Sequence, residues 1–174
     1  MLADSEEMHE LAQASQGVIT RLEEKFGKFY QSAKITLSSA HYAQDLSFAS
    51  LIKVDHVIYK QRAYALINDP EDNDLRKAIG VDHHNCRLGK WYEAVGKEVF
   101  GDLPSYRTLL QPHSQVHAGV HRAVSLLDAG WEYDDKVQAE MIAAMAGSEA
   151  SSADVMEILN RMVVEKHPEL AKGH

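Results

Sequence analysis

Cysteine, proline and glycine are scarce in this chain, and their scarcity narrows the possible folds. Cys86 is the only cysteine, so no disulfide can form within the chain. A single thiol fits a reducing compartment, and we expect the protein to be cytoplasmic. Four prolines and ten glycines are spread over 174 residues, and strand-like alternation between regular turns is missing. Long stretches without helix breakers therefore predict an all-α fold.

The chain also lacks long apolar runs and an excess of basic residues. No stretch approaches the roughly 18 to 20 apolar residues that span a bilayer, so we expect no membrane insertion within this chain. Acidic residues outnumber basic ones by 26 to 18, which gives a net charge of −8. Nucleic acids and anionic membranes attract concentrated Lys and Arg, so neither is expected as a partner.

Apolar residues recur at steps of three and four, which is the period of a buried helix face. This pattern predicts helices over about 5–39, 42–67, 76 or 83 to 100, 105–127 and 133–165, and the third is interrupted or entered near 80–82. We expect an antiparallel four-helix bundle at 42–167, with a helical arm or coil extension at 1–41 and a disordered tail at 168–174. The apolar stripe of the arm suits either one more bundle helix or a helix from another chain. The small polar stretch 147–152 is either a packing patch or a break.

One thiol and three imidazoles are spaced so that they can share a metal ion. His113 and His117 lie one helical turn apart on one face. His56 precedes Cys86 by 30 residues, and Cys86 precedes His113 by 27, so each separation suits one helix–turn–helix step. Thiolate sulfur and imidazole nitrogen are ligands that zinc prefers. From spacing alone a metal-free interaction bundle, with His56 and Cys86 in an ordinary core, stays open.

Three further histidines lie close to these positions in the sequence. His83 and His84 precede Cys86 within one turn, and His83 is either a residue that supports the ligands or part of a solvated helix start. His121 continues the spacing of His113 and His117 by one turn, so it either competes as a ligand or lies at the bundle surface.

Three strings together resemble a known family. Residues 53–60 (KVDHVIYK), 86–92 (CRLGKWY) and 113–117 (HSQVH) are similar to the motifs of the bacterial chemoreceptor zinc-binding domain, in the same order and at matching separations. The resemblance implies a four-helix bundle that binds Zn²⁺ through His56, Cys86, His113 and His117. One departure is that Tyr59 takes the aromatic position where family members usually have Trp.

The resemblance also implies a function. A closed site with four protein ligands leaves no water to activate, and the segment 113–117 lacks the Glu of the HExxH hydrolase motif, so we expect no enzyme. The implied role is a sensory domain of a bacterial chemotaxis protein that responds to zinc or to oxidants such as hypochlorous acid. It would form the C-terminal part of a homodimeric chemoreceptor and act on the signalling domain of its parent polypeptide. Alternatives are the regulation of a diguanylate cyclase, whose own motif this chain lacks, and a haem or di-iron bundle.

Overall fold

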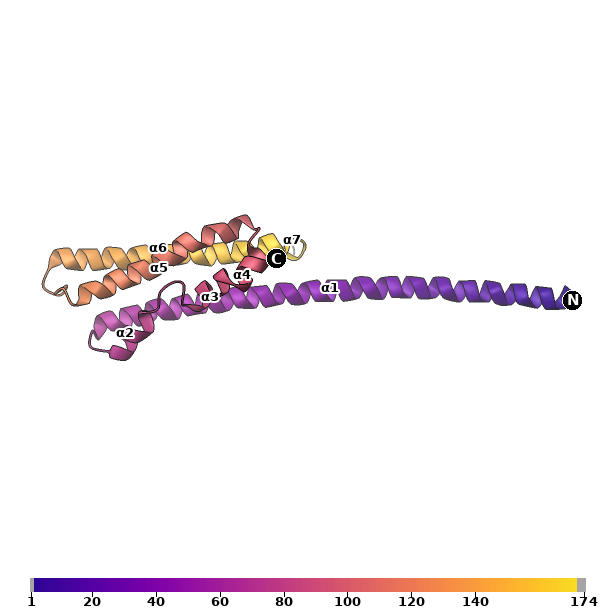
Figure 1. The fold of residues 1–174 in the computed structure, drawn as a ribbon, viewed down its shortest axis with the longest axis horizontal. Coiled ribbons are helices and arrows are strands. Elements are labelled where there is room, and N and C mark those ends of the chain that lie inside the picture. Colours follow the sequence, from indigo (N-terminus) through magenta and orange to yellow (C-terminus); the bar gives the residue numbers. More distant parts are fainter. Residues whose placement is uncertain (1, 172–174) are drawn as a thin grey trace. The chain divides into compact units, whose positions relative to one another are not determined.

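The computed structural model describes residues 2–171, with side chains from 5 to 170, and this part of the chain is helical apart from short turns. The helices are α1 (Leu2–Asn68), α2 (Asn73–Ile79), α3 (Arg87–Glu93), α4 (Val95–Phe100), α5 (Pro104–Leu127), α6 (Asp135–Lys166) and α7 (Pro168–Ala171). The all-α bundle expected from the sequence is confirmed (Figure 1). Within the described residues, no helix has the length and apolar character that crossing a membrane requires.

Helix α1 is continuous, so the break predicted between residues 39 and 42 is wrong. The cause is plain in the sequence: no Gly or Pro occurs between Gly27 and Pro70, and the small residues around Ser39 do not stop a helix. The helix ends at Asn68, two residues before Pro70, as expected from the steric restriction that proline places on its predecessor.

The chain forms two compact units, one up to Ala43 and one from Gln44 onward. The first unit consists of the N-terminal part of α1. Its large apolar side chains are exposed: Met8, Leu11, Val18, Ile19, Leu22, Phe26, Phe29, Tyr30, Ile35 and Leu37. Gly17 and Gly27 lie in open space, so neither marks a close contact within the chain.

The second unit is built around the C-terminal part of α1 and the long helices α5 and α6. Side-chain contacts join α1 to α6, among them Asp45 with Lys166, Lys53 with Asn160, and Lys60 with Glu149. Residue numbers rise along α1 as they fall along α6, so these two helices are antiparallel. Helices α5 and α6 lie side by side (Figure 1).

The contact between α5 and α6 is unusually close at one level. A Cβ atom on Gly119 would lie 2.7 Å from the carbonyl oxygen of Ala144, so only glycine fits there. Next to it, the fully buried Ser148 donates a hydrogen bond of 3.0 Å from Oγ to the carbonyl of Val116. The stretch 147–152 is therefore a packing patch within an unbroken α6 and not a break. An apolar cluster fills the space between α1, α2, α5 and α6: Ala63, Leu66, Ile79, Val120, Ala123, Leu126, Leu127, Met141 and Met145.

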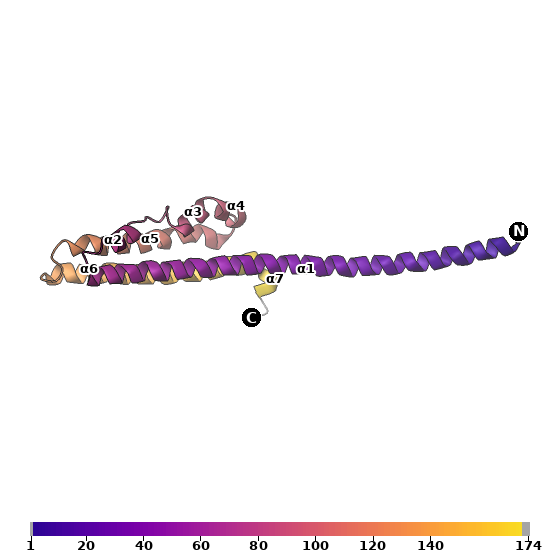
Figure 2. The ribbon, with the colours of Figure 1, turned by 90° about the horizontal axis from the view of Figure 1, so that it is seen from below.

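The helix predicted from 76 or 83 to 100, interrupted or entered near 80–82, consists of three short helices, α2, α3 and α4 (Figure 2). A turn over 80–86 separates α2 from α3, because the side chain of Asp82 accepts hydrogen bonds from the backbone N–H groups of His84 and Asn85. Ala94, in a non-helical conformation, separates α3 from α4. The hydrogen bonds of Asp82 compete with helix formation over residues 80–86.

The C-terminal end also differs from the sequence prediction. Residues 168–171 form the short helix α7 where a disordered tail was expected. The rest of that predicted tail, 172–174, lies outside the described residues.

Candidate metal centre

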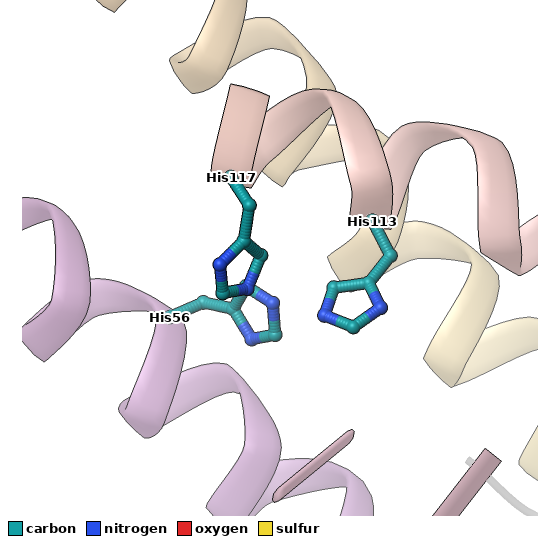
Figure 3. A group of neighbouring side chains, drawn as sticks. All are labelled: His56, His113 and His117. Carbon is teal, nitrogen blue, oxygen red and sulfur yellow. The ribbon is translucent and has the colours of Figure 1, made fainter. Parts of the chain in front are cut away.

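Three histidines from two helices converge in the interior of the second unit. His56 comes from α1, and His113 and His117 come from α5 (Figure 3). One ring nitrogen from each lies within 4.8 Å of those of the other two. Their residues are only 4%, 1% and 4% exposed. Three buried imidazoles that face one another form a strong donor set for a metal ion.

Backbone carbonyls fix the orientation of two of the rings. Nδ1 of His56 donates a hydrogen bond of 2.9 Å to the carbonyl of Ile52, one turn earlier in α1. Nδ1 of His117 donates one of 2.9 Å to the carbonyl of Val81, in the turn before α3. Because a carbonyl only accepts, both Nδ1 atoms carry the proton, and each Nε2 keeps its lone pair free for a ligand. This is the usual arrangement of histidines that bind metals.

Nε2 of His56 tests whether a metal fits this site. It is buried and has no hydrogen-bond partner among the described residues. A buried polar atom without a partner costs about 1–3 kcal/mol, so it calls for an explanation. A cation between the three rings supplies one, because it would accept the lone pair of this nitrogen. The donor set contains no carboxylate, so it fits zinc and lacks the bridging groups of a di-iron centre.

Cys86 borders this group from the start of α3. Its Sγ lies 3.2 Å from Nε2 of His113, and the residue is half-buried. It is the N-cap of α3, where Sγ accepts a hydrogen bond of 3.4 Å from the N–H of Gly89. The close cluster of ligand atoms comprises the three histidines, and the structure brings Cys86 into contact with His113 at its edge.

Gly89 allows the start of α3 to pack closely against the turn that precedes it. A Cβ atom at this position would lie 1.9 Å from the carbonyl oxygen of His83 and 2.7 Å from that of His84. The start of α3 therefore presses directly on the preceding turn, and no side chain fits between them. Glycine lets Cys86 lie at the helix N-terminus while remaining in contact with His113 on α5.

Burial keeps the three imidazoles neutral. Desolvation is the largest cause of lowered pKa values, and repulsion between neighbouring histidines adds to it. The pKa of His113 falls to about 3 and that of His117 to about 4, and the pKa of His56 is also lowered. The neutral imidazole is the form that binds metals, so the site is ready for a cation at neutral pH.

The pKa of the Cys86 thiol is raised, whereas those of the histidines are lowered. Burial raises its pKa, and the N–H groups of Gly89 and Leu88 oppose this by favouring the thiolate. The carboxylates of Asp55 and Asp82 also raise the pKa. Without a metal the thiol therefore keeps its proton at neutral pH, and a bound cation would supply the positive charge that stabilises the thiolate.

Several neighbours of the cluster take roles that the sequence did not specify. The ring of Tyr59 packs 4.6 Å from that of His117, centroid to centroid, and its hydroxyl donates to the carbonyl of Ile79. Asp55 does not orient His56 but lies 3.3 Å from Nε of Arg87, an ion pair that joins α1 to α3. The carbonyls of Ile52 and Val81 had no sequence signature, because any residue provides a carbonyl.

His121 and His83 flank the cluster on two sides. Nε2 of His121 donates a hydrogen bond of 3.0 Å to the carbonyl of Ile79, and its ring centroid lies 6.2 Å from that of His117. His83 lies in the turn before Cys86, with its ring centroid 5.9 Å from that of His113 and 6.4 Å from that of His117.

Comparison with known proteins supports this reading of the site. Residues 56–124 match the family model described as the chemoreceptor zinc-binding domain, and the matched segment begins at His56 and contains Cys86, His113 and His117. No curated protein and no solved structure matches the chain. Zinc is the metal that this family binds, and the triad His56, His113 and His117 is an arrangement that can hold it. The segment 56–124 is thus similar to the chemoreceptor zinc-binding domain family, whose members serve in signalling and are not a known catalytic family.

Proposed function

We propose that the second unit is the zinc-dependent sensory domain of a cytoplasmic bacterial chemotaxis protein, with His56, Cys86, His113 and His117 as zinc ligands. The observation that carries this proposal is the unpartnered, buried Nε2 of His56, which faces the two imidazoles of α5. A bound zinc ion would give Nε2 of His56 the partner that it lacks.

Cys86 is the fourth ligand in this proposal. Three imidazoles leave one tetrahedral position, and the thiol already contacts Nε2 of His113. Zinc supplies two things when bound: it holds the thiolate without its proton, and it links α1, α5 and the start of α3. Four protein ligands leave no open coordination position, which supports sensing over catalysis.

Oxidant sensing follows from the position of the thiol. A cavity of about 400 Å³ opens beside Cys86, and Asp55, Tyr59 and Arg87 are among its other lining residues. A small oxidant therefore has a route to the sulfur. Hypochlorous acid would oxidise the thiolate by two electrons to the sulfenic acid, and its chlorine would leave as chloride with no net proton released. The sulfenic acid is a poorer ligand, so α3 would lose its link to α5.

Helix α1 is the element that would carry the change to a signalling domain of the same polypeptide. It contains His56, and in the first unit it carries exposed apolar side chains such as Leu22, Phe26 and Phe29. Exposed apolar residues at steps of three and four are typical of a helix that pairs with another helix. A second copy of the chain is the partner that we propose, which makes the protein a homodimer.

The test combines metal analysis with controlled oxidation. Protein purified without chelator should contain near-stoichiometric zinc, and hypochlorous acid should weaken its binding while Cys86 is consumed. Cys86→Ala should bind zinc more weakly and lose the response to the oxidant. A Cys86→Ala variant with full affinity and an intact response would refute the sensory role of the thiol, and protein without zinc would refute the metal site.

A further inference from the structure

We infer that His83 is a reserve ligand, which takes the fourth coordination position beside His56, His113 and His117 when the thiolate of Cys86 is absent or oxidised. This inference rests on the proposed zinc site. It adds a function for a histidine that the four-ligand assignment leaves out.

The position of His83 is the first argument. Its ring centroid lies 5.9 Å from that of His113 and 6.4 Å from that of His117. The corresponding distances for His56 are 5.3 Å and 6.4 Å. His83 is therefore about as close to the pair on α5 as His56 is. It approaches from the turn that also carries Cys86, with its ring nearly perpendicular to that of His113, at 86°.

The ring nitrogens of His83 are the second argument. Among the described residues, neither nitrogen has a hydrogen-bond partner, whereas the neighbouring histidines are engaged. His84 pairs through Nδ1 with Glu93, and His121 donates from Nε2 to the carbonyl of Ile79. A ring nitrogen without a partner is what a replacement ligand requires.

The third argument is the physical connection between His83 and the thiol. The carbonyl of His83 lies 3.6 Å from Sγ of Cys86 and accepts its hydrogen bond. Asp82 braces the same turn, because its Oδ1 accepts from the N–H groups of His84 at 3.0 Å and Asn85 at 2.8 Å. The two donors, sulfur and imidazole, therefore belong to one short, braced turn.

Free space between this turn and α5 is the fourth argument. A cavity of about 270 Å³ is lined by Asp82 and His83 on one side and by residues of α5, including Ser114, His117 and His121, on the other. His83 and His117 line the same space, so the imidazole has room to move toward the metal position. The exchange of ligands needs a side-chain movement and no unfolding of the turn.

The consequence is that the site exchanges Cys86 for His83 when the thiol is lost and keeps its zinc ion. A neutral imidazole in place of a thiolate keeps four tetrahedral donors and makes the centre more positive by one charge. The sulfenic acid of Cys86, no longer bound to zinc, would be free to react with thiols. Zinc would stay bound until Cys86 is reduced again.

The experiment is a double-mutant cycle on the full chain, with zinc affinity measured by competition with a chromophoric chelator. Cys86→Ala should still bind one zinc, more weakly by about tenfold or more, and Cys86→Ala/His83→Ala should lose about a further tenfold or more. The matched control is Cys86→Ala/His84→Ala, which removes the adjacent histidine that pairs with Glu93 and should bind like Cys86→Ala. Helical content by circular dichroism checks that each variant is folded.

Cobalt substitution gives an independent readout of geometry. Cys86→Ala loaded with Co²⁺ should lose the thiolate charge-transfer band but keep the intense visible bands of four-coordinate cobalt, and adding His83→Ala should weaken those bands. Equal affinity and equal spectra with and without His83 in the Cys86→Ala background would overturn the inference, as would a Cys86→Ala protein that binds no zinc. Failure of the unsubstituted chain to bind zinc would instead overturn the proposed function on which the inference rests.

Discussion

Sγ of Cys86 lies 3.2 Å from Nε2 of His113, across 27 residues of sequence. This contact joins the N-terminus of α3 to the middle of α5, and it is the point where the thiol meets the histidine cluster. The three histidines are buried, whereas Cys86 is half-buried and lines a cavity that also reaches His56 and His117. The proposed centre thus combines a buried, neutral donor set with one accessible and oxidisable donor.

Removing one imidazole should abolish tight zinc binding. His117→Ala takes away a ring whose Nε2 is free to bind and whose Nδ1 is held by the carbonyl of Val81, so zinc affinity should fall by at least about tenfold. His121→Ala is the matched control one turn further along α5, since its ring is directed to Ile79. Competition titrations with a chelator measure both. If the two variants lose the same affinity, the ligand set is wrong.

Gly89→Ala should damage the metal centre without removing a ligand. The added Cβ would lie 1.9 Å from the carbonyl oxygen of His83, so the start of α3 must move and carry Cys86 away from His113. We expect weaker zinc binding and a more reactive thiol, measured by the rate of alkylation. Gly17→Ala serves as the control, because nothing lies within 4 Å of that site. An unchanged zinc affinity in Gly89→Ala would refute this role.

The packing of α5 against α6 can be tested in metal-free protein. Gly119→Ala would place a Cβ 2.7 Å from the carbonyl of Ala144, a backbone atom that cannot yield easily, and should lower the free energy of unfolding by about 1–3 kcal/mol. Gly147→Ala, in open space on α6, should raise it by about 0.5–1 kcal/mol through helix propensity. Urea denaturation measures both changes. If both variants changed the free energy of unfolding in the same direction, the close approach of α5 to α6 at Gly119 would be contradicted.

The stability of the metal-free protein should depend on pH through the buried histidines. His113 and His117 titrate at about 3 and about 4 in the fold and near 6.5 in the unfolded chain. Between these values the unfolded state binds more protons, so the free energy of unfolding falls as pH is lowered from about 6.5 toward 4. Each histidine contributes up to about 1.4 kcal/mol per pH unit. Urea midpoints across this range give the slope.

A variant separates this effect from the titration of other groups. His113→Leu removes one of the two buried imidazoles and should make the slope shallower between pH 4 and 6.5. The same slope in His113→Leu and in the unsubstituted chain would show that His113 is not held neutral by the fold.

The bundle and the cluster of His56, His113 and His117 could be predicted from the sequence because both depend on spacing. The i, i+4 pair His113 and His117 and the steps to His56 and Cys86 place donors on facing elements whatever the local detail. An interruption or helix start near 80–82 was predicted, but the hydrogen bonds of Asp82 that form the turn and the break at Ala94 were not. Likewise, the carbonyls that orient the rings carry no side-chain signature.

The most direct test of the central claim is zinc-edge X-ray absorption of the full chain purified without chelator. A site formed by Cys86 and three histidines predicts one sulfur at about 2.3 Å and three nitrogens at about 2.0–2.1 Å in the first coordination shell. A first shell without sulfur, or protein without zinc, would contradict the account.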